Sequence, residues 1–256
     1  MPNEIPPRAV LHYIAGQLGA DLESFSSYAR REPTRLEHVS YLLAYLGMRT
    51  PAASDRRAAL MSAIETAAMT DKGSFIARTI ITTMRERNVL LPSPETIERI
   101  GLAARAIARR RAEAALISDF SLEQLQSIDD LLKVDPAITQ TRFHWLRSAP
   151  DAPAAGNLVA MMERLSFIRA LNVDPRLQAR IHSGRWDQMI REGDVTPAWL
   201  AADFNGSRRR ATIVAQIIRL GQKLTDDAVT MFVKLIGRLF SQANTRKVQR
   251  HVETRK

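Results

Sequence analysis

The chain has 256 residues, 45% of them hydrophobic and 25% charged, which is typical of a globular protein and excludes wholesale disorder. Lys and Arg number 37 against 27 Asp and Glu, and 31 of the 37 are Arg, whose guanidinium fork favours phosphate and so a nucleic acid partner. The lack of cysteine excludes disulfides and thiolate sites, and no apolar run reaches the length of a membrane span. We therefore expect a cytoplasmic protein.

Apolar residues recur every three or four positions almost throughout, and alternating runs of β-branched and aromatic residues are absent. This pattern predicts an all-α fold of consecutive helical bundles without strands. Capping residues, prolines and glycines mark the ends of the helices, including a capping box at Thr34 and Glu37 and another at Ser121 and Gln124. In chain order, helices are expected at 8–18, 22–28, 34–47, 55–69, 74–88, 93–116, 121–131, 143–147, 157–171, 175–191, 197–202, 207–220 and from 225 to beyond 240.

Two joints are expected between the helical units. Leu91-Pro92-Ser93 forms one, and the stretch from Ser148 to Pro153, with two prolines in six residues, forms the clearer one. The expected units are residues 1–92, with a candidate DNA-binding function, residues 93–148, and residues 149–256, which are basic.

Motifs for catalysis are missing from the sequence. It has no glycine-rich phosphate loop ending in Gly-Lys-Ser/Thr, no Gly-x-Ser-x-Gly elbow, and no pair of histidines at zinc-binding spacing. We therefore expect no catalytic, cofactor-binding or metal-binding residues, and no enzyme activity of this chain by itself.

Two pairs of neighbouring carboxylates, Asp129-Asp130 and Asp226-Asp227, could suggest two-metal phosphodiester chemistry. Neighbours on a helix point about 100° apart, however, and both pairs lie within predicted helices. Asp226 and Asp227 are expected in a first helical turn, where the helix dipole favours negative charge. A structural role is therefore preferred for both pairs.

Two runs of arginine are more suggestive of binding. Arg109-Arg110-Arg111 lies inside a predicted helix, where consecutive positions fan around the axis, so a solvated face and a binding face are equally good interpretations. Arg208, Arg209 and Arg210 are expected to open a helix, where guanidinium groups join free backbone amides that favour phosphate. A local carboxylate such as Asp203 is the alternative partner.

The first three predicted helices, ending near Leu46, are compatible with a helix-turn-helix arrangement. Arg30, Arg31, Arg35 and Arg49 surround the second and third of them, and His38 lies on the third. A plain helical bundle shows the same periodicity, so the pattern alone does not separate the two.

Several short motifs recur along the chain in a characteristic order and spacing. They are Pro7–Gly19 with Tyr28, Arg31–His38 (Thr34-Arg35 and Glu37-His38), Leu91-Pro92 with Glu98-Arg99, Leu131-Leu132, Trp145–Arg147, Glu163–Leu165 with Ile168-Arg169, Arg191–Gly193, Arg208–Arg210 and Leu224–Ala228. Together these motifs resemble the N-terminal part of the large replicative transposases of the Tn-three family, which move transposons through cointegrates. The similarity covers nearly the whole chain.

This resemblance implies a helical region that recognises the terminal inverted repeats of a transposon, associated with the bacterial nucleoid. In the family, a downstream RNase H-like domain carries three metal-binding acidic residues, and the resemblance implies that this chain stops before it and starts after the family's own N-terminus. The expected partners are double-stranded DNA and, as an open alternative, a second copy of the chain. The expected DNA-binding residues are Arg30, Arg31, Arg35, His38, Arg49, Arg208, Arg209 and Arg210.

A helical dimerisation or interaction scaffold without DNA contact is the alternative function. Arginines gathered on one face favour DNA binding, whereas dispersed arginines paired with carboxylates favour the scaffold.

Overall fold

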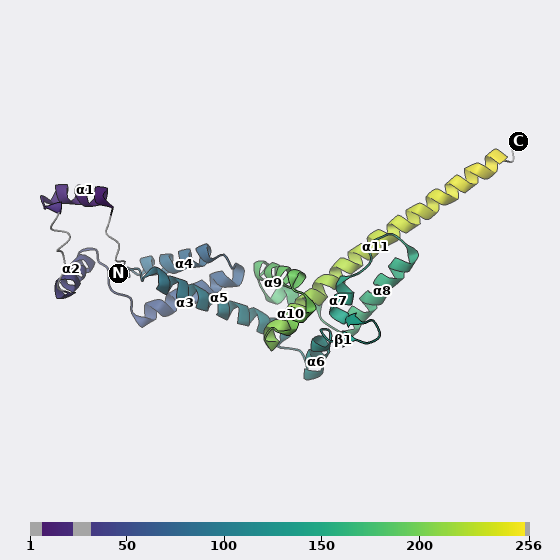
Figure 1. The fold of residues 1–256 in the computed structure, drawn as a ribbon, viewed down its shortest axis with the longest axis horizontal. Coiled ribbons are helices and arrows are strands. Elements are labelled where there is room, and N and C mark those ends of the chain that lie inside the picture. Colours follow the sequence, from purple (N-terminus) through teal and green to yellow (C-terminus); the bar gives the residue numbers. More distant parts are fainter. Residues whose placement is uncertain (1–6, 23–31, 254–256) are drawn as a thin grey trace. The chain divides into compact units, whose positions relative to one another are not determined.

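A computed structural model describes residues 7–22 and 32–253 of the chain. The described residues are mostly helical, which confirms the all-α prediction (Figure 1). They divide into two compact units: unit 1 runs to Ala67 and resumes at Lys72–Arg105, and unit 2 comprises Ala68–Asp71 and the chain from Ala106 onward. The three units expected from the sequence stay a prediction.

Unit 1 begins with two helices that expose their apolar side chains. The sequence places Val10, Ile14 and Leu18 on one face of the first helix, and all three side chains are exposed in the structure. Gly19 caps that helix with a φ of 61°, a left-handed conformation that favours glycine. The helices described in unit 1 are α1 (Arg8–Leu18), α2 (Glu32–Tyr45), α3 (Ala53–Met69), α4 (Gly73–Glu86) and the first half of α5 (Pro94–Ile117).

The core of unit 1 lies among α3, α4 and α5. Apolar residues spaced by four, such as Ile76, Ile80 and Met84 of α4, are fully buried, as are the alanines on the inner face of α3. The Cβ position of Gly101 in α5 is 3.6 Å from Cγ2 of Ile76, so a small residue here lets α5 approach α4 closely. Short side chains thus allow three helices to pack tightly.

Unit 2 is built around one long helix. Its elements are the second half of α5, α6 (Leu122–Asp130), β1 (Val134–Asp135), β2 (Gln140–Thr141), α7 (Arg142–Arg147), α8 (Ala155–Ala170), the 3-10 helix η2 (Pro175–Arg180), α9 (Ser183–Val195), α10 (Ala198–Ala202) and α11 (Gly206–Glu253). The capping box predicted at Ser121 and Gln124 is present at the start of α6.

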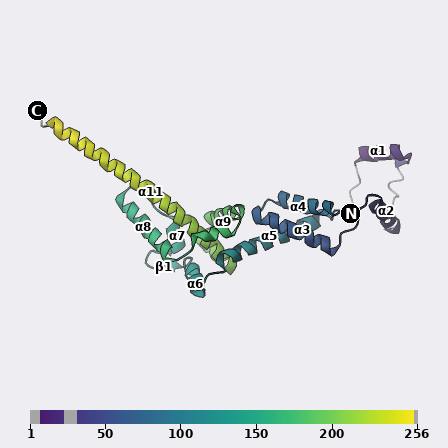
Figure 2. The same cartoon turned by 180° about the vertical axis from the view of Figure 1, so that it is seen from behind.

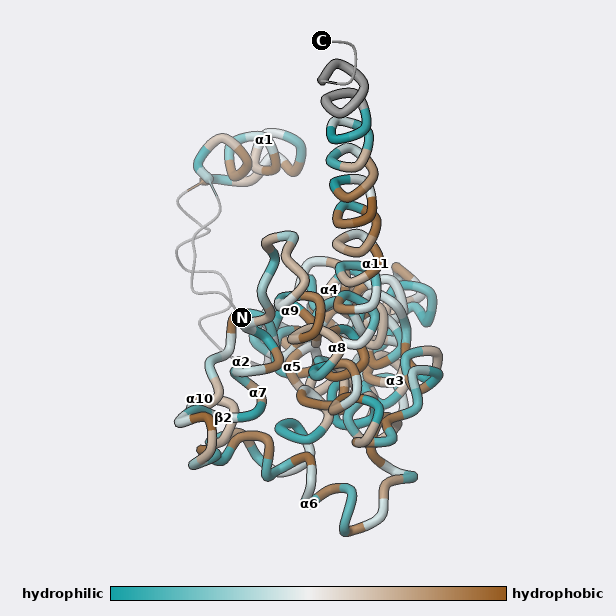
Figure 3. Tube along the Cα trace, turned by 90° about the vertical axis from the view of Figure 1, so that its right-hand side faces the viewer, coloured by the Kyte–Doolittle hydropathy of each residue, from teal (hydrophilic) through white to brown (hydrophobic). Residues whose placement is uncertain are grey.

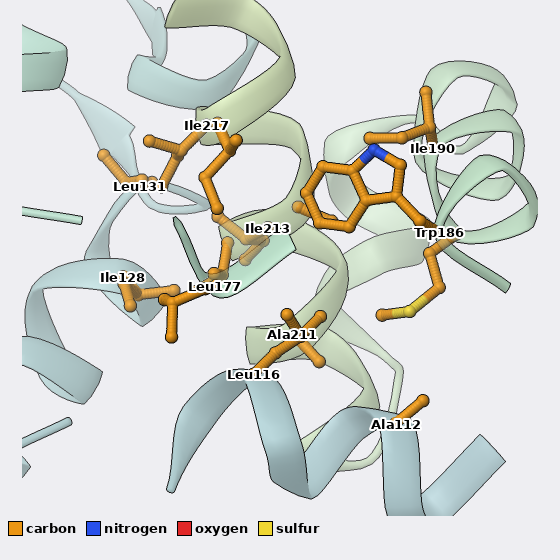
Figure 4. Close-up of a cluster of buried hydrophobic side chains, with 14 of the residues drawn as sticks. Ala112, Leu116, Ile128, Leu131, Leu177, Trp186, Ile190, Ala211, Ile213 and Ile217 are labelled. Atoms are coloured by element: carbon orange, nitrogen blue, oxygen red, sulfur yellow. The ribbon is translucent and has the colours of Figure 1, made fainter. Parts of the chain in front are cut away.

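Helix α11 supplies the centre of this core. Every residue from 211 to 218 is buried, so this part of α11 is covered on all sides rather than on one face. Figure 4 shows Ile213 and Ile217 of α11 among side chains from α5, α6 and α9, including Leu116, Ile128 and Trp186. Farther along, α8 lies beside α11 in both Figure 1 and Figure 2, and the two helices share a smaller apolar cluster.

The prediction that no strand is present is wrong in one place. Val134 and Asp135 pair with Thr141 and Gln140 in a two-stranded antiparallel hairpin. The carboxylate of Asp135 accepts a hydrogen bond from the amide of Ala137 at 2.8 Å and stabilises the turn. Strands of two residues are too short to show an alternating pattern, which is why the sequence does not predict them.

Three predicted helix boundaries are also wrong. The helices expected at 207–220 and from 225 are one continuous helix, α11, because a single glycine at 221 costs a helix only about 1 kcal/mol. Asp226 and Asp227 therefore lie in its interior and not in a first turn. The helix expected at 175–191 is divided into η2 and α9, and α2 begins at Glu32, before the expected cap at Thr34.

Candidate nucleic-acid interface

A buried carboxylate in unit 1 holds two surface arginines. Asp55, in the first turn of α3, is 0% exposed. Its oxygens accept hydrogen bonds from both terminal nitrogens of Arg49, at 2.5 and 2.7 Å, and from Nε of Arg87 at 2.7 Å. The two arginine side chains are 50% and 42% exposed, so the carboxylate is inside and the guanidiniums reach the surface. We call Arg49 and Arg87, which Asp55 holds together, the unit 1 arginine pair.

The backbone fixes both arginines in place. The amide of Arg49 donates to the carbonyl of Asn88 at 3.0 Å, and the amide of Leu90 donates to the carbonyl of Arg49 at 2.9 Å. These two bonds form a parallel bridge between Arg49 and Val89, which joins the segment before α3 to the segment after α4. Asn88 has a φ of 52°, the left-handed conformation that asparagine tolerates, so the chain turns directly after Arg87.

The electrostatics of this pair favour an anion. Hydrogen bonds from Arg49, then from Arg87 and the amide of Ala52, hold the pKa of Asp55 well below its usual range. The carboxylate is therefore ionised at neutral pH, and two guanidiniums against one carboxylate leave a net charge of +1. Arg87 uses only Nε for this ion pair, so its terminal nitrogens are not needed there.

More arginines lie next to this pair in the sequence. Arg56 and Arg57 directly follow Asp55, Arg85 lies two residues before Arg87, and all three side chains are exposed. Besides Asp55, which already binds Arg49 and Arg87, Glu86 is the carboxylate nearest to them in the sequence. This end of α3 and α4 therefore gathers positive charge on the surface of unit 1.

The other predicted DNA-binding residues of the N-terminal region have different outcomes. Arg30 and Arg31 lie outside the described residues, as does most of the predicted second helix, so the helix-turn-helix arrangement stays a prediction. Arg35 lies on α2, but its side chain is outside the described part. His38 is an exposed residue of α2. Arg49 is the one predicted residue here with a described ion pair.

In unit 2, Arg208, Arg209 and Arg210 are all paired with carboxylates. Arg208 forms an ion pair with Glu192 of α9, and its guanidinium lies 3.8 Å from the ring centroid of Phe204. Nε of Arg209 and Nε of Arg210 donate to the two oxygens of Asp129 in α6, at 2.9 and 3.0 Å. The partners are thus Glu192 and Asp129, and Asp203, the partner considered from the sequence, is not among the ion pairs described for these three arginines.

These arginines are less available than the unit 1 arginine pair. The side chains of Arg209 and Arg210 are 25% and 30% exposed. Arg209 also donates to the carbonyls of Ala202 and Phe204 at 3.2 and 3.3 Å. The start of α11 is therefore tied to α6, and each of these arginines already donates to an oxygen of its own unit.

A buried carboxylate lies in the interior of unit 2, within the influence of these arginines. Glu113 of α5 is buried, and burial raises the pKa of its carboxyl group, while the positive charges of Arg109 and Arg208 act in the opposite direction. Arg109 therefore faces an internal carboxylate, whereas Arg110 and Arg111 are exposed. The run of three arginines in α5 is divided between the interior and the surface.

The described part of the chain contains no group of three or more His, Asp or Glu side chains placed to hold a metal ion. Of the two carboxylate pairs, Asp129 accepts from arginines, Asp130 pairs with Lys133, and Asp227 pairs with Lys223. No helix in the described ranges is both long and apolar enough to cross a membrane.

The sequence analysis missed Asp55 and Arg87. Asp55 carries a weak signal, because it occupies a first helical turn with Arg49 before it and Arg56 after it. Arg87 follows Asp55 by 32 residues, and only the packing of α3 against α4 brings the two together.

A comparison with known protein families agrees with the extent of unit 1. A family described as a domain of unknown function (DUF4158) matches residues 1–104. Unit 1 ends at Arg105, so the match covers almost the same residues as that unit.

The chain is also similar along most of its length to curated transposases. It is 34% identical over 248 residues to the transposase for transposon Tn3926 and 33% identical over 248 residues to the transposase for transposon Tn21, both from Escherichia coli, covering 96% of this chain. It is 31% identical over 244 residues to the transposase for transposon Tn501 from Pseudomonas aeruginosa, covering 95%. In each case the chain spans about a quarter, 25%, of the relative's length.

Proposed function

Because this chain belongs to the Tn-three family of transposases over the quarter of their length that it spans, we propose that it binds double-stranded DNA at the ends of a transposon. The observation that carries this proposal is the unit 1 arginine pair, in which a buried carboxylate presents two guanidiniums at the surface of the DUF4158 region.

Such a pair suits a DNA phosphate. A guanidinium donates two parallel N–H groups to a phosphate, and holding its side chain in place beforehand lowers the entropy lost on binding. Asp55 and the bridge between Arg49 and Val89 provide that restraint. Phosphate contacts set the register of a protein on the duplex, so we assign Arg49 and Arg87 to positioning and not to base reading.

Base reading would then come from the helices before α3. We propose that Arg30, Arg31, Arg35 and His38 contact the same duplex. The exposed apolar side chains of α1 and α2 support the view that these helices pack against something further when DNA is bound.

We propose that these 256 residues bind DNA without cutting it. In support, the carboxylate of Asp129 binds two arginines, and Asp226 lies inside a continuous helix and not in a cluster of carboxylates.

The test is a footprinting experiment on the transposon-end duplex. We expect the chain to protect the end sequence, and the double variant Arg49→Gln and Arg87→Gln to lose that protection at the same protein concentration. The control is Arg169→Gln with Arg176→Gln, which removes the same charge from two exposed arginines of unit 2. Equal loss of protection in both double variants would assign the effect to net charge and contradict the proposed site.

A second candidate function is a helical interaction scaffold, and the ion pairs of Arg208, Arg209 and Arg210 favour it for unit 2. These arginines bind carboxylates of their own unit, which is the arrangement expected of structural charge. DNA contact by these three residues stays a prediction, and so does a homodimer. The scaffold is preferred if the folded chain fails to retard any duplex at low salt, where non-specific phosphate contacts are strongest.

A further inference from the structure

Unit 2 has an open pocket beside its hairpin. Three parts of the unit line this pocket: helix α7, the two strands, and the segment that runs from Val195 into α10. Its volume is about 610 Å³, within the range of about 300–1,000 Å³ that is typical of small-ligand sites. Figure 3 shows α7, α10 and β2 together at one edge of the view, with hydrophobic residues among hydrophilic ones. We call this site the α7–α10 pocket.

Two large apolar side chains that line the pocket are open to solvent. Trp199 of α10 is 70% exposed, and Val195 is 81% exposed. Among the described residues, the ring of Trp199 makes no aromatic or cation–π contact. A tryptophan this exposed at a pocket offers an apolar ring surface on which a second flat ring can stack.

The charge of the lining is positive. Arg147 and His144 of α7 line the pocket, and no carboxylate side chain does. The guanidinium of Arg147 donates to the carbonyl of Thr196 at 2.8 Å and also to that of Asp194. It lies 5.3 Å from the ring centroid of Phe143. Neutral groups therefore hold this guanidinium in place, and its positive charge has no carboxylate partner within the described part of the chain.

A nucleotide combines the two properties that this lining selects, because its base is a flat ring and its phosphate is an anion. Aromatic side chains with arginine beside them are the usual means of binding unpaired bases. In a duplex the bases are stacked inside, so a pocket on a protein receives a base only when that base is unpaired or turned out. An acidic peptide with an apolar side chain shares part of this chemistry. The net charge of +10 and the DNA binding proposed above favour the nucleotide.

We infer that the α7–α10 pocket binds an unpaired base of DNA, with the base stacked on Trp199 and its phosphate beside Arg147. The inference rests on the proposed DNA binding and adds a substrate class to it, namely DNA with unpaired nucleotides. The two sites have separate tasks, since Arg49 and Arg87 hold phosphates of the duplex and the pocket takes a base that has left it.

The first test compares the affinity of the whole chain for one single strand of the transposon end and for the paired duplex, by fluorescence anisotropy. Stacking of a base on an aromatic side chain corresponds to a factor of about 5 to 100 in affinity. We therefore expect Trp199→Ala to bind the single strand more weakly by this factor and the duplex as tightly as the wild-type chain does. Trp199→Phe keeps a flat ring and should recover part of the loss.

The control for this test is Leu122→Ala, which shortens another apolar side chain of unit 2. Leu122 is 86% exposed and lies outside the pocket, so the variant should bind both DNAs as the wild-type chain does. Because Trp199 is itself mostly exposed, its substitution should leave the circular dichroism spectrum unchanged.

The second test reads the stacking and the charge of the pocket directly. The probe is the same single strand with 2-aminopurine, a fluorescent base, in place of single adenines. We expect the wild-type chain to quench this fluorescence and Trp199→Ala to leave it unquenched. At the exposed position 195, Val195→Asp should weaken binding of the single strand by repelling its phosphates, whereas Val195→Lys should not.

Two results would overturn the inference. One is equal affinity of the wild-type chain and Trp199→Ala for the single strand. The other is binding of an acidic peptide with one phenylalanine that depends on Trp199, while binding of the single strand does not, which would assign the pocket to a protein partner. The Arg49→Gln and Arg87→Gln variant should lose affinity for the duplex and keep the Trp199-dependent binding of the single strand, so failure of this inference and failure of the duplex proposal are distinguishable.

Discussion

Asp55 determines how two distant arginines are presented on unit 1. A charged group inside a protein is tolerated only when it is paired and hydrogen-bonded, and Asp55 has three such partners: Arg49, Arg87 and the amide of Ala52. Removing its charge is therefore expected to change both the stability of the fold and the positions of the two arginine side chains at the surface.

We expect Asp55→Asn to lower the free energy of unfolding at pH 7, because the variant leaves two guanidiniums without their carboxylate. The folded-state pKa of Asp55 lies below its unfolded value of about 3.9. The stabilisation is therefore complete above that value and is lost as the pH falls through it toward the folded pKa. Chemical denaturation at several pH values should show a smaller drop in stability below pH 4 for Asp55→Asn than for the wild-type chain. Parallel pH profiles for the two chains would contradict this role.

Asp129 has the corresponding role in unit 2, where its carboxylate binds two arginines. Burial pushes the pKa of its carboxyl group up, but hydrogen bonds from Arg209 and Arg210 outweigh this effect, and the pKa lies below its usual value. Because it joins α6 to the start of α11, we expect Asp129→Asn to lower the free energy of unfolding by about 1–3 kcal/mol. Its neighbour Asp130 pairs with Lys133 on the surface, where solvent screens the ion pair, so Asp130→Asn should change stability much less than Asp129→Asn does. Equal effects of the two substitutions in thermal denaturation would disprove the structural role of Asp129.

At the scale of elements, the crossing of α9 over α11 depends on one glycine. A Cβ atom at Gly193 would lie 2.4 Å from Nε2 and 2.6 Å from Cγ of Gln216. Gln216 is buried and donates to the carbonyl of Ile190 at 2.8 Å, so it cannot move without losing that hydrogen bond. The close approach of the two helices therefore requires glycine.

We expect Gly193→Ala to destabilise the chain by about 1–3 kcal/mol through overpacking. Gly237→Ala, in the exposed part of α11, has no neighbouring atom within 4 Å and should stabilise the chain by up to about 1 kcal/mol through helix propensity. Thermal unfolding followed by circular dichroism compares the two. A Gly193→Ala chain as stable as the wild type would show that α9 and α11 do not pack as described.

The sequence predicts helices where local signals decide the structure. The capping box at Ser121 and the proline that starts α5 mark their helices correctly, because capping depends on residues three or four apart. The sequence also predicts the helical state of residues 207–220 correctly, although burial of residues 211–218 on all sides leaves no single apolar face there. The prediction fails at Gly221, where it places a helix end, although packing against α8 keeps the helix continuous there.

At the scale of the molecule, the candidate site depends on contacts that the sequence does not encode locally. Arg49 was predicted for its position after the third helix, and the structure adds Asp55 and Arg87 to it. The pairing of Arg209 and Arg210 with Asp129 joins residues 80 and 81 positions apart, so only the packing of α6 against α11 could show it. Charge content was predictable, whereas the division of arginines between structural and accessible roles was not.

We expect no strand cleavage or joining by this chain. Purified protein incubated with end DNA and Mg²⁺ or Mn²⁺ should leave the DNA intact, because the carboxylates of Asp129, Asp130 and Asp227 are engaged by cations of the protein. Metal-dependent nicking that disappears in Asp129→Asn or Asp226→Asn would contradict this prediction.

The central claim is that the unit 1 arginine pair holds DNA phosphates, and its most direct test is the salt dependence of binding. Each phosphate neutralised by an arginine adds about 0.9 to the slope of log affinity against log salt. Titrations of the wild-type chain and the Arg49→Gln and Arg87→Gln variant with end and scrambled duplexes, between about 50 and 200 mM salt, give both slopes. We expect the variant to bind both duplexes more weakly, with a slope shallower by about 1 to 2. An unchanged slope and affinity in a variant whose circular dichroism matches the wild type would contradict the claim.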